Sequence, residues 1–111
     1  MKRILTTLIV LTIMMRLMAL ETSTNEMPIV YRLPIFSNIN STTWVHTQRA
    51  FAEAEELNAE VIIIHLNTYG GEVVFADSMR TKILNSQIPV HVFIDNNAAS
   101  AGALISIACN K

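Results

Sequence analysis

Apolar residues along this chain gather in short continuous runs that alternate with longer segments of helical periodicity. The runs at 61–66 (VIIIHL) and 90–94 (VHVFI) are typical of parallel strands that are buried on both faces. Around them, apolar residues recur at the spacing of a helix with one buried face. The pattern predicts strands and helices in strict alternation, over residues 28–36, 42–57, 61–66, 72–85, 90–94 and 101–109.

This alternation predicts an α/β fold with a parallel sheet, because neighbouring parallel strands need a crossover connection that a helix supplies. Pro34 interrupts the first predicted strand, which favours an edge position or a bulge. Asp95 and the two asparagines after it are expected to end the third strand in a turn. Since parallel strands end at one edge of a sheet, the residues that follow 61–66 and 90–94 should meet there.

The N-terminal residues 1–20 differ in character from the rest of the chain. Lys2 and Arg3 precede an apolar run that only threonines interrupt before Arg16, and a polar stretch follows. This is the layout of a secretory signal peptide, with an uncleaved membrane anchor or a helix of the fold as alternatives. We therefore expect a signal peptide or N-terminal membrane anchor over 1–20, a linker over 21–27, and a protein exported across or anchored in the cell membrane.

Charge and cysteine content exclude several classes of function. With 8 basic and 9 acidic residues the formal net charge is −1 and no basic patch is present, so no nucleic-acid partner is expected. One cysteine cannot form an internal disulfide, and one cysteine with three scattered histidines does not make a zinc site. We expect no metal and no cofactor, and we expect Cys109 to be buried in an apolar helix.

Candidate chemistry lies where the two apolar strands end. Ser100 stands among small residues in the stretch 98–103 (AASAGA), and Gly70 and Gly71 follow the preceding strand. Taken alone, Ser100 could equally be a small polar residue that caps a helix. The glycine pair at the neighbouring strand exit favours another role, because backbone N–H groups there could bind the oxyanion of a serine-centred reaction. Together the two elements indicate a serine nucleophile with an oxyanion hole.

The stretches NTYGG at 67–71 and AASAG at 98–102, with a helix and a strand between them, resemble the Clp-class serine peptidases. Within that class they are most similar to the NfeD (nodulation efficiency protein D) membrane-bound proteases and to relatives of signal peptide peptidase A. The resemblance implies a Clp/crotonase-like parallel sheet with crossover helices. Residues 28–111 would form the N-terminal portion of such a protease domain, which is incomplete here.

By this resemblance Ser100 is the catalytic nucleophile, and Gly70, Gly71 and Ala101 line the oxyanion hole. Tyr69 stands where the family usually carries proline, which alters the rigidity of the turn. The resemblance also implies a polypeptide substrate drawn from hydrophobic segments of membrane-associated proteins. It implies membrane association and a homo-oligomer when the protein is full length.

The resemblance further implies a lysine downstream of the serine as general base, in a Ser–Lys dyad. Lys111 follows Ser100, but a helix between them would separate the two by roughly 16 Å, beyond the reach of a lysine side chain. Lys82 is expected on a solvated helix face, and His65 and His91 are expected on a sheet face or in the core. We therefore expect the general base to be absent from this chain, which alone would be inactive.

Three other functions stay open from the sequence. The chain could be a catalytically inactive fragment or scaffold of the same fold. It could be a crotonase-like acyl-CoA enzyme, which shares the fold and a backbone oxyanion hole, although an export signal disfavours cytosolic acyl-CoA chemistry. An α/β-hydrolase is suggested loosely by the spacing of Ala98, Ser100 and Gly102, but that fold does not explain Gly70 and Gly71.

Overall fold

The structure, a computed structural model, describes residues 1–20 and 26–109. Most of the predicted linker 21–27 lies outside the described residues, and so does Lys111. The predicted alternation of strands and helices is confirmed. The elements are α1 (Lys2–Leu20), β1 (Val30–Ile35), α2 (Ser41–Glu56), β2 (Val61–Thr68), α3 (Val73–Leu84), β3 (Val90–Ala98) and α4 (Ala101–Ala108).

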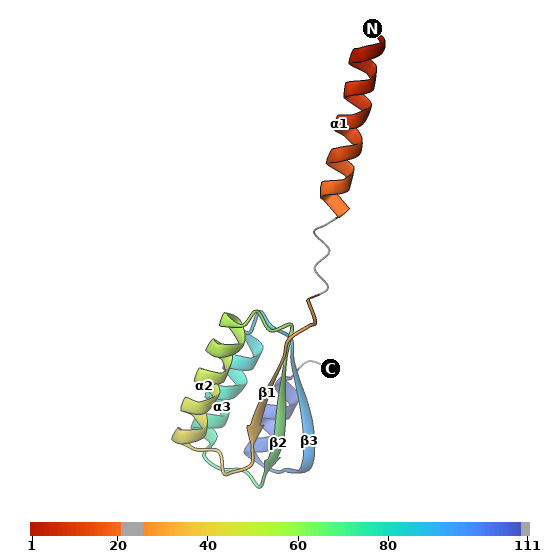
Figure 1. The fold of residues 1–111 in the computed structure, drawn as a ribbon. Helices are drawn as coiled ribbons and strands as arrows, with labels where there is room; N and C mark the ends of the chain where they lie inside the picture. The colour runs from red at the N-terminus through yellow and green to blue at the C-terminus, as the bar shows by residue number, and fades with distance from the viewer. Residues whose placement is uncertain (21–25, 110–111) are drawn as a thin grey trace.

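The three strands form one parallel sheet in the order β1-β2-β3. Strand β1 is an edge strand, as Pro34 predicted. Pro34 lies opposite His65 of β2 and is exposed, where its missing N–H costs no sheet hydrogen bond. Helices α2 and α3 connect the strands and lie side by side against one face of the sheet (Figure 1).

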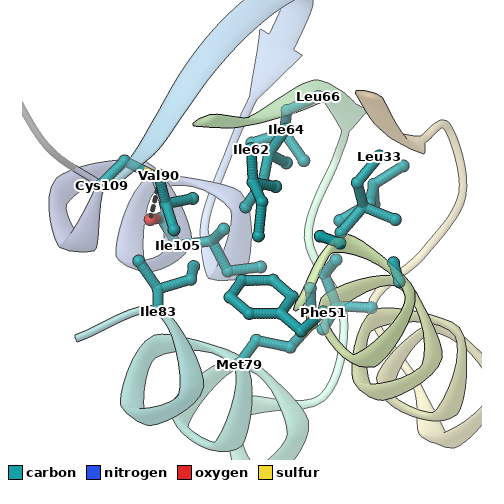
Figure 2. Close-up of a cluster of buried hydrophobic side chains, with 14 of the residues drawn as sticks. Leu33, Phe51, Ile62, Ile64, Leu66, Met79, Ile83, Val90, Ile105 and Cys109 are labelled. Carbon is teal, nitrogen blue, oxygen red and sulfur yellow. Dashed lines mark hydrogen bonds between the residues drawn. The ribbon is translucent and has the colours of Figure 1, made fainter. Parts of the chain in front are cut away.

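The hydrophobic core lies between that face of the sheet and the helices. Ile62, Ile64 and Leu66 alternate along β2 toward the helices, and each is 0% exposed. Figure 2 shows these side chains above Phe51 of α2 and Ile105 of α4, both of which are fully buried. Every second residue of β2 and the residues along one face of each helix thus pack together in one buried layer.

The opposite face of the sheet is not covered by a helix in the part of the chain that the structure describes. On β2 the side chains of Ile63, His65 and Asn67 are only half-buried, and Phe93 on β3 is 56% exposed. The prediction that β2 and β3 are buried on both faces is therefore wrong for these residues. The crossover helices of both parallel connections lie on one side, and a continuous apolar run does not reveal how many of its faces are covered.

Strand β3 is longer than predicted. Its pairing with β2 continues to Ala98, opposite Thr68, after a shift in register between Leu66 and Thr68. At this shift the Asn67 side chain bonds to the neighbouring strand, because its Oδ1 accepts a hydrogen bond from the Asn97 backbone N–H at 3.2 Å. Asp95 therefore lies within the strand, and the prediction of a turn there is wrong.

Helix α2 shows how local chemistry sets an element's ends. The Asn40 Oδ1 accepts a hydrogen bond from the Thr43 backbone N–H at 3.0 Å and so caps the first turn. At the other end Asn58 adopts a φ of 54°, the left-handed conformation that commonly ends helices. Thr47 and Ala54 are fully buried, which confirms the predicted apolar stripe.

Residues 1–18, which include most of helix α1, are all exposed and contribute no side chain to the core. The hydroxyls of Thr6, Thr7 and Thr12 donate to backbone carbonyls one turn earlier in the same helix. Among the described residues, no helix has the length and hydropathy needed to span a bilayer.

Cys109 is buried, as predicted, at 6% exposure. Its Sγ lies 3.5 Å from the Ile105 carbonyl oxygen, to which the thiol donates. Burial raises the pKa of the Cys109 thiol to about 11, so the unreactive protonated form persists at neutral pH.

The one-sided core predicts different costs for two adjacent isoleucines of β2. Ile64→Ala is expected to lower the free energy of unfolding by about 2–5 kcal/mol, because it leaves a cavity in the buried layer. Ile63→Ala changes the same residue type on the half-exposed face and is expected to cost less than half as much. Urea unfolding of both variants measures the difference, and equal losses would contradict a core confined to one face.

Candidate active site

The connection from β3 to α4 is a sharp turn centred on Ser100. Ser100 has φ 51° and ψ −114°, a conformation that a side chain makes unfavourable. Among the described non-glycine residues, only Asn58 shares a positive φ. A strained serine between a strand and a helix, with its side chain exposed, has the geometry of a nucleophile elbow.

The Ser100 hydroxyl does not cap helix α4. Its side chain makes no capping hydrogen bond, although Ser100 occupies the N-cap position. Only its carbonyl takes part in the first turn, accepting from the Ala103 N–H at 3.0 Å. The interpretation of Ser100 as a helix cap is therefore wrong, and the hydroxyl has no hydrogen-bond partner among the described residues.

The turn after β2 lies directly against Ser100, as the two motifs predicted. A Cβ atom built on Gly70 would lie 2.9 Å from Ser100 Cβ and 3.4 Å from Ser100 Oγ. Gly70 also has φ 123°, which side chains rarely adopt. Two segments separated by a whole helix are thus brought into contact, and only glycine fits at this contact.

Gly71 is held against the loop that follows β1. The Gly70 carbonyl accepts from the Ile39 N–H, and the Ile39 carbonyl accepts from the Glu72 N–H, each at 2.8 Å. A Cβ on Gly71 would lie 2.1 Å from the Ile39 carbonyl oxygen, an impossible approach to rigid backbone. This short bridge fixes the orientation of the glycine turn from the side away from Ser100.

The backbone N–H groups around Ser100 differ in their availability. The Gly70 N–H donates to Thr68 Oγ1 at 3.2 Å, so it is already engaged. The N–H groups of Gly71 and Ala101 have no acceptor within the described part of the chain. Free N–H groups flanking an exposed hydroxyl are the components that an oxyanion hole requires.

No described basic side chain is hydrogen-bonded to the Ser100 hydroxyl. Lys82 lies in α3 with its Nζ 5.6 Å from the centre of the Phe51 ring, toward α2. Lys82 is half-buried over that ring, so it is less exposed than expected for a residue on a solvated helix face. The other described lysine, Lys2, belongs to α1.

His65 lies on the open face of the sheet and is hydrogen-bonded through Nδ1 only, since its buried Nε2 has no hydrogen-bond partner among the described residues. Its Nδ1 accepts from Arg32, with Nη2 at 2.6 Å, so the ring proton lies on Nε2. That Nε2 is 3.6 Å from an Asp95 carboxylate oxygen. The Phe36 and Phe93 rings pack edge-on to the imidazole at 4.7 and 5.0 Å. Both ring nitrogens therefore face residues of neighbouring strands, which agrees with the expected sheet-face role.

Sequence reasoning missed two residues that build this site. Thr68 holds the Gly70 turn, and a hydroxyl two residues before a glycine turn is a local signal that could have indicated it. Ile39 bridges Gly71 through its backbone alone, which leaves no signal in the residue type. Within residues 1–20 and 26–109, no group of three metal-ligating side chains lies close enough together to hold a metal ion.

Comparison with known proteins decides the family. Residues 29–111 match the family model described as the N-terminal domain of NfeD1b. The chain belongs to this family. It is 34% identical over 82 residues to the membrane protein NfeD1b of Bacillus subtilis (strain 168), covering 74% of this chain and 19% of that protein. The chain thus spans about a fifth of the length of that curated relative.

Solved structures confirm a Clp-like fold. The 1510-N membrane protease specific for a stomatin homolog from Pyrococcus horikoshii is similar, with a TM-score of 0.69 and 36% identity over 76% of this chain and 44% of that chain. ClpP1 from Listeria monocytogenes is similar with a TM-score of 0.68 and 25% identity, over 71% of this chain and 46% of that chain. The α/β fold with a parallel sheet and crossover helices matches part of a protease domain in each.

The strained turn predicts how Ser100 variants differ in stability. Ser100→Gly is expected to be more stable than Ser100→Ala by about 1 kcal/mol, because glycine adopts the positive φ without its steric cost. Both changes remove the hydroxyl, so their difference isolates the backbone. Denaturant unfolding of the two variants in parallel measures it. An alanine variant as stable as the glycine variant would show that the turn stores no strain.

Proposed function

We propose that this chain carries the nucleophile and the oxyanion hole of a serine endopeptidase of the Clp class. The observation that carries this proposal is the contact of Gly70 with a strained, exposed Ser100. The family and the named protease relatives support peptide-bond hydrolysis as the reaction. They also favour it over acyl-CoA chemistry on a related fold.

In the proposed mechanism the Ser100 Oγ attacks the carbonyl carbon of a peptide bond. The carbonyl oxygen becomes an oxyanion, which the N–H groups of Gly71 and Ala101 stabilise in a site lined by Gly70. Collapse of the tetrahedral intermediate breaks the C–N bond and leaves an acyl ester on Ser100. Water then hydrolyses this ester and restores the hydroxyl.

A general base must accept the Ser100 proton and later deliver it to the leaving amine. We assign this role to a lysine outside the described residues, in a Ser–Lys dyad. A buried lysine is neutral at working pH, since desolvation lowers its pKa. The free Ser100 hydroxyl supports this assignment, because no described lysine or histidine is hydrogen-bonded to it.

The proposed substrate is a hydrophobic segment of a membrane-associated protein. Residues 1–20 would act as signal peptide or N-terminal membrane anchor, joined by the linker 21–27 to the protease portion 28–111. The NfeD1b relative is named a membrane protein, and the 1510-N relative is named for its specificity toward a stomatin homolog. A homo-oligomer of the full-length protein is part of the same proposal.

A second candidate function is an inactive scaffold that keeps the fold without completing the dyad. It is favoured by one specific observation, namely that Ser100 Oγ lacks a hydrogen-bonded base among the described residues. In this function the only role of the glycine turn would be to preserve the fold.

A fluorophosphonate probe distinguishes the two candidates. In a longer polypeptide that supplies the lysine, we expect covalent labelling at Ser100, located by peptide mass spectrometry, and its complete loss in Ser100→Ala. Ser106→Ala is the matched control, because that hydroxyl only donates to the Gly102 carbonyl at 2.8 Å within α4. It should leave the labelling rate unchanged.

Two outcomes would contradict the proposal. A longer polypeptide that is not labelled at Ser100 would support the scaffold function and leave the family assignment intact. Labelling that persists in Ser100→Ala would refute the assigned nucleophile.

A further inference from the structure

Thr68, the last residue of β2, is connected to every segment that borders Ser100. It is 2% exposed, and it is one of three buried polar side chains among the described residues. Each of its three groups, the hydroxyl, the carbonyl and the methyl, contacts a different element. The hydroxyl and methyl contacts are not part of strand pairing, whereas the carbonyl bond belongs to the last pair of β2 with β3, Thr68 opposite Ala98.

The hydroxyl of Thr68 orients the glycine turn. It donates to the Ser37 carbonyl at 2.8 Å, with the Gly70 carbonyl oxygen as a second, longer acceptor at 3.2 Å, and it accepts from the Gly70 N–H at 3.2 Å. The first bond fixes the hydroxyl on the loop after β1, so its lone pair faces Gly70. The turn is thereby bent so that Gly70 meets Ser100 and the Gly71 N–H stays free.

The carbonyl and the methyl of Thr68 contact the turn that contains Ser100. The carbonyl accepts from the Ala99 N–H at 3.1 Å, which anchors the residue before Ser100. The methyl group Cγ2 lies 2.7 Å from where a Cβ on Gly102 would be. Helix α4 therefore rests on this methyl in its first turn, and only glycine permits so close an approach.

We propose that Thr68 is a positioning residue that sets the two N–H groups of the oxyanion hole relative to Ser100. Its hydroxyl positions the Gly71 N–H by holding the glycine turn. Its methyl positions the Ala101 N–H by its contact with Gly102 in the first turn of α4. A Thr68→Ser variant would keep the hydroxyl and lose the methyl contact, whereas a Thr68→Val variant would keep the methyl contact and lose the hydroxyl. This inference rests on the proposed function for its catalytic consequence, but the positioning itself is a property of the fold.

The test compares Thr68→Val and Thr68→Ser with Thr47→Val as matched control. Thr47 is also buried, at 0% exposure, and its hydroxyl donates to the Thr43 carbonyl at 2.8 Å inside α2, remote from the glycine turn. Amide hydrogen exchange followed by NMR reports on each backbone N–H separately. Urea unfolding reports on the whole fold, so local and global effects are separated.

Thr68→Val is expected to speed exchange of the Gly70 amide about tenfold beyond any global change, because that N–H loses its acceptor. Thr68→Ser should keep Gly70 protected and instead speed exchange of the Gly102 and Ala103 amides in the first turn of α4. Thr47→Val should change neither set beyond its effect on global stability. In protein that a fluorophosphonate labels, Thr68→Val should slow labelling of Ser100 about tenfold.

Two results would overturn the inference. One is a Gly70 amide in Thr68→Val whose exchange changes only as much as its global stability. The other is a Thr68→Ser variant that shows the same pattern of exchange as Thr68→Val. If the longer polypeptide is not labelled at Ser100 either, the proposed function fails, while the exchange comparison still decides the role of Thr68.

Discussion

The contact between Gly70 and Ser100 is the constraint on which the site depends. With a Cβ built on Gly70 only 2.9 Å from Ser100 Cβ, neither segment can shift without breaking the other's geometry. This contact requires parallel β2 and β3 to end at the same edge of the sheet. It also requires a glycine at φ 123°, which residues with a side chain rarely adopt, and a serine at φ 51°, which is unfavourable. The surrounding structure must supply the free energy that holds the serine there.

The core on one face of the sheet supplies that support. Ile64 and Leu66 lead along β2 to Thr68, and Ile105 fixes α4 against the same layer (Figure 2). Because α4 begins immediately after Ser100, the packing of α4 against the core also restrains the backbone of Ser100. The opposite face carries the Arg32–His65 pair and exposed rings instead, so the polar chemistry of the sheet is separated from the core.

Periodicity along the chain was enough to predict the order of strands and helices, because the strand and helix patterns do not overlap here. It was also enough to predict that the turn after β2 meets the turn after β3, since parallel strands share an edge. Two expectations failed for physical reasons. A continuous apolar run such as 61–66 has the same pattern whether one face or both are covered. The polar residues at 95–97 have turn propensity, but pairing with Asn67 and Thr68 keeps them in β3.

The finer features of the site depend on contacts that residue types do not encode. The positive φ of Ser100 is a conformation that serine itself disfavours, and the Ile39 bridge to Gly71 uses backbone atoms only. Thr68 was visible within the glycine motif, but its bond to Ser37 joins residues from different strand–helix units. Sequence therefore indicated which residues form the site, and the structure explains how they are held.

In the proposed active site, Ser100, Gly71 and Ala101 converge on one reacting group. A crystal structure of the protein with a bound peptide boronate tests this convergence. We expect a covalent bond from boron to Ser100 Oγ, with one boronate oxygen about 2.7–3.1 Å from the N–H groups of Gly71 and Ala101. A boronate bonded to another residue, or one on Ser100 whose oxygens avoid both N–H groups, would contradict it.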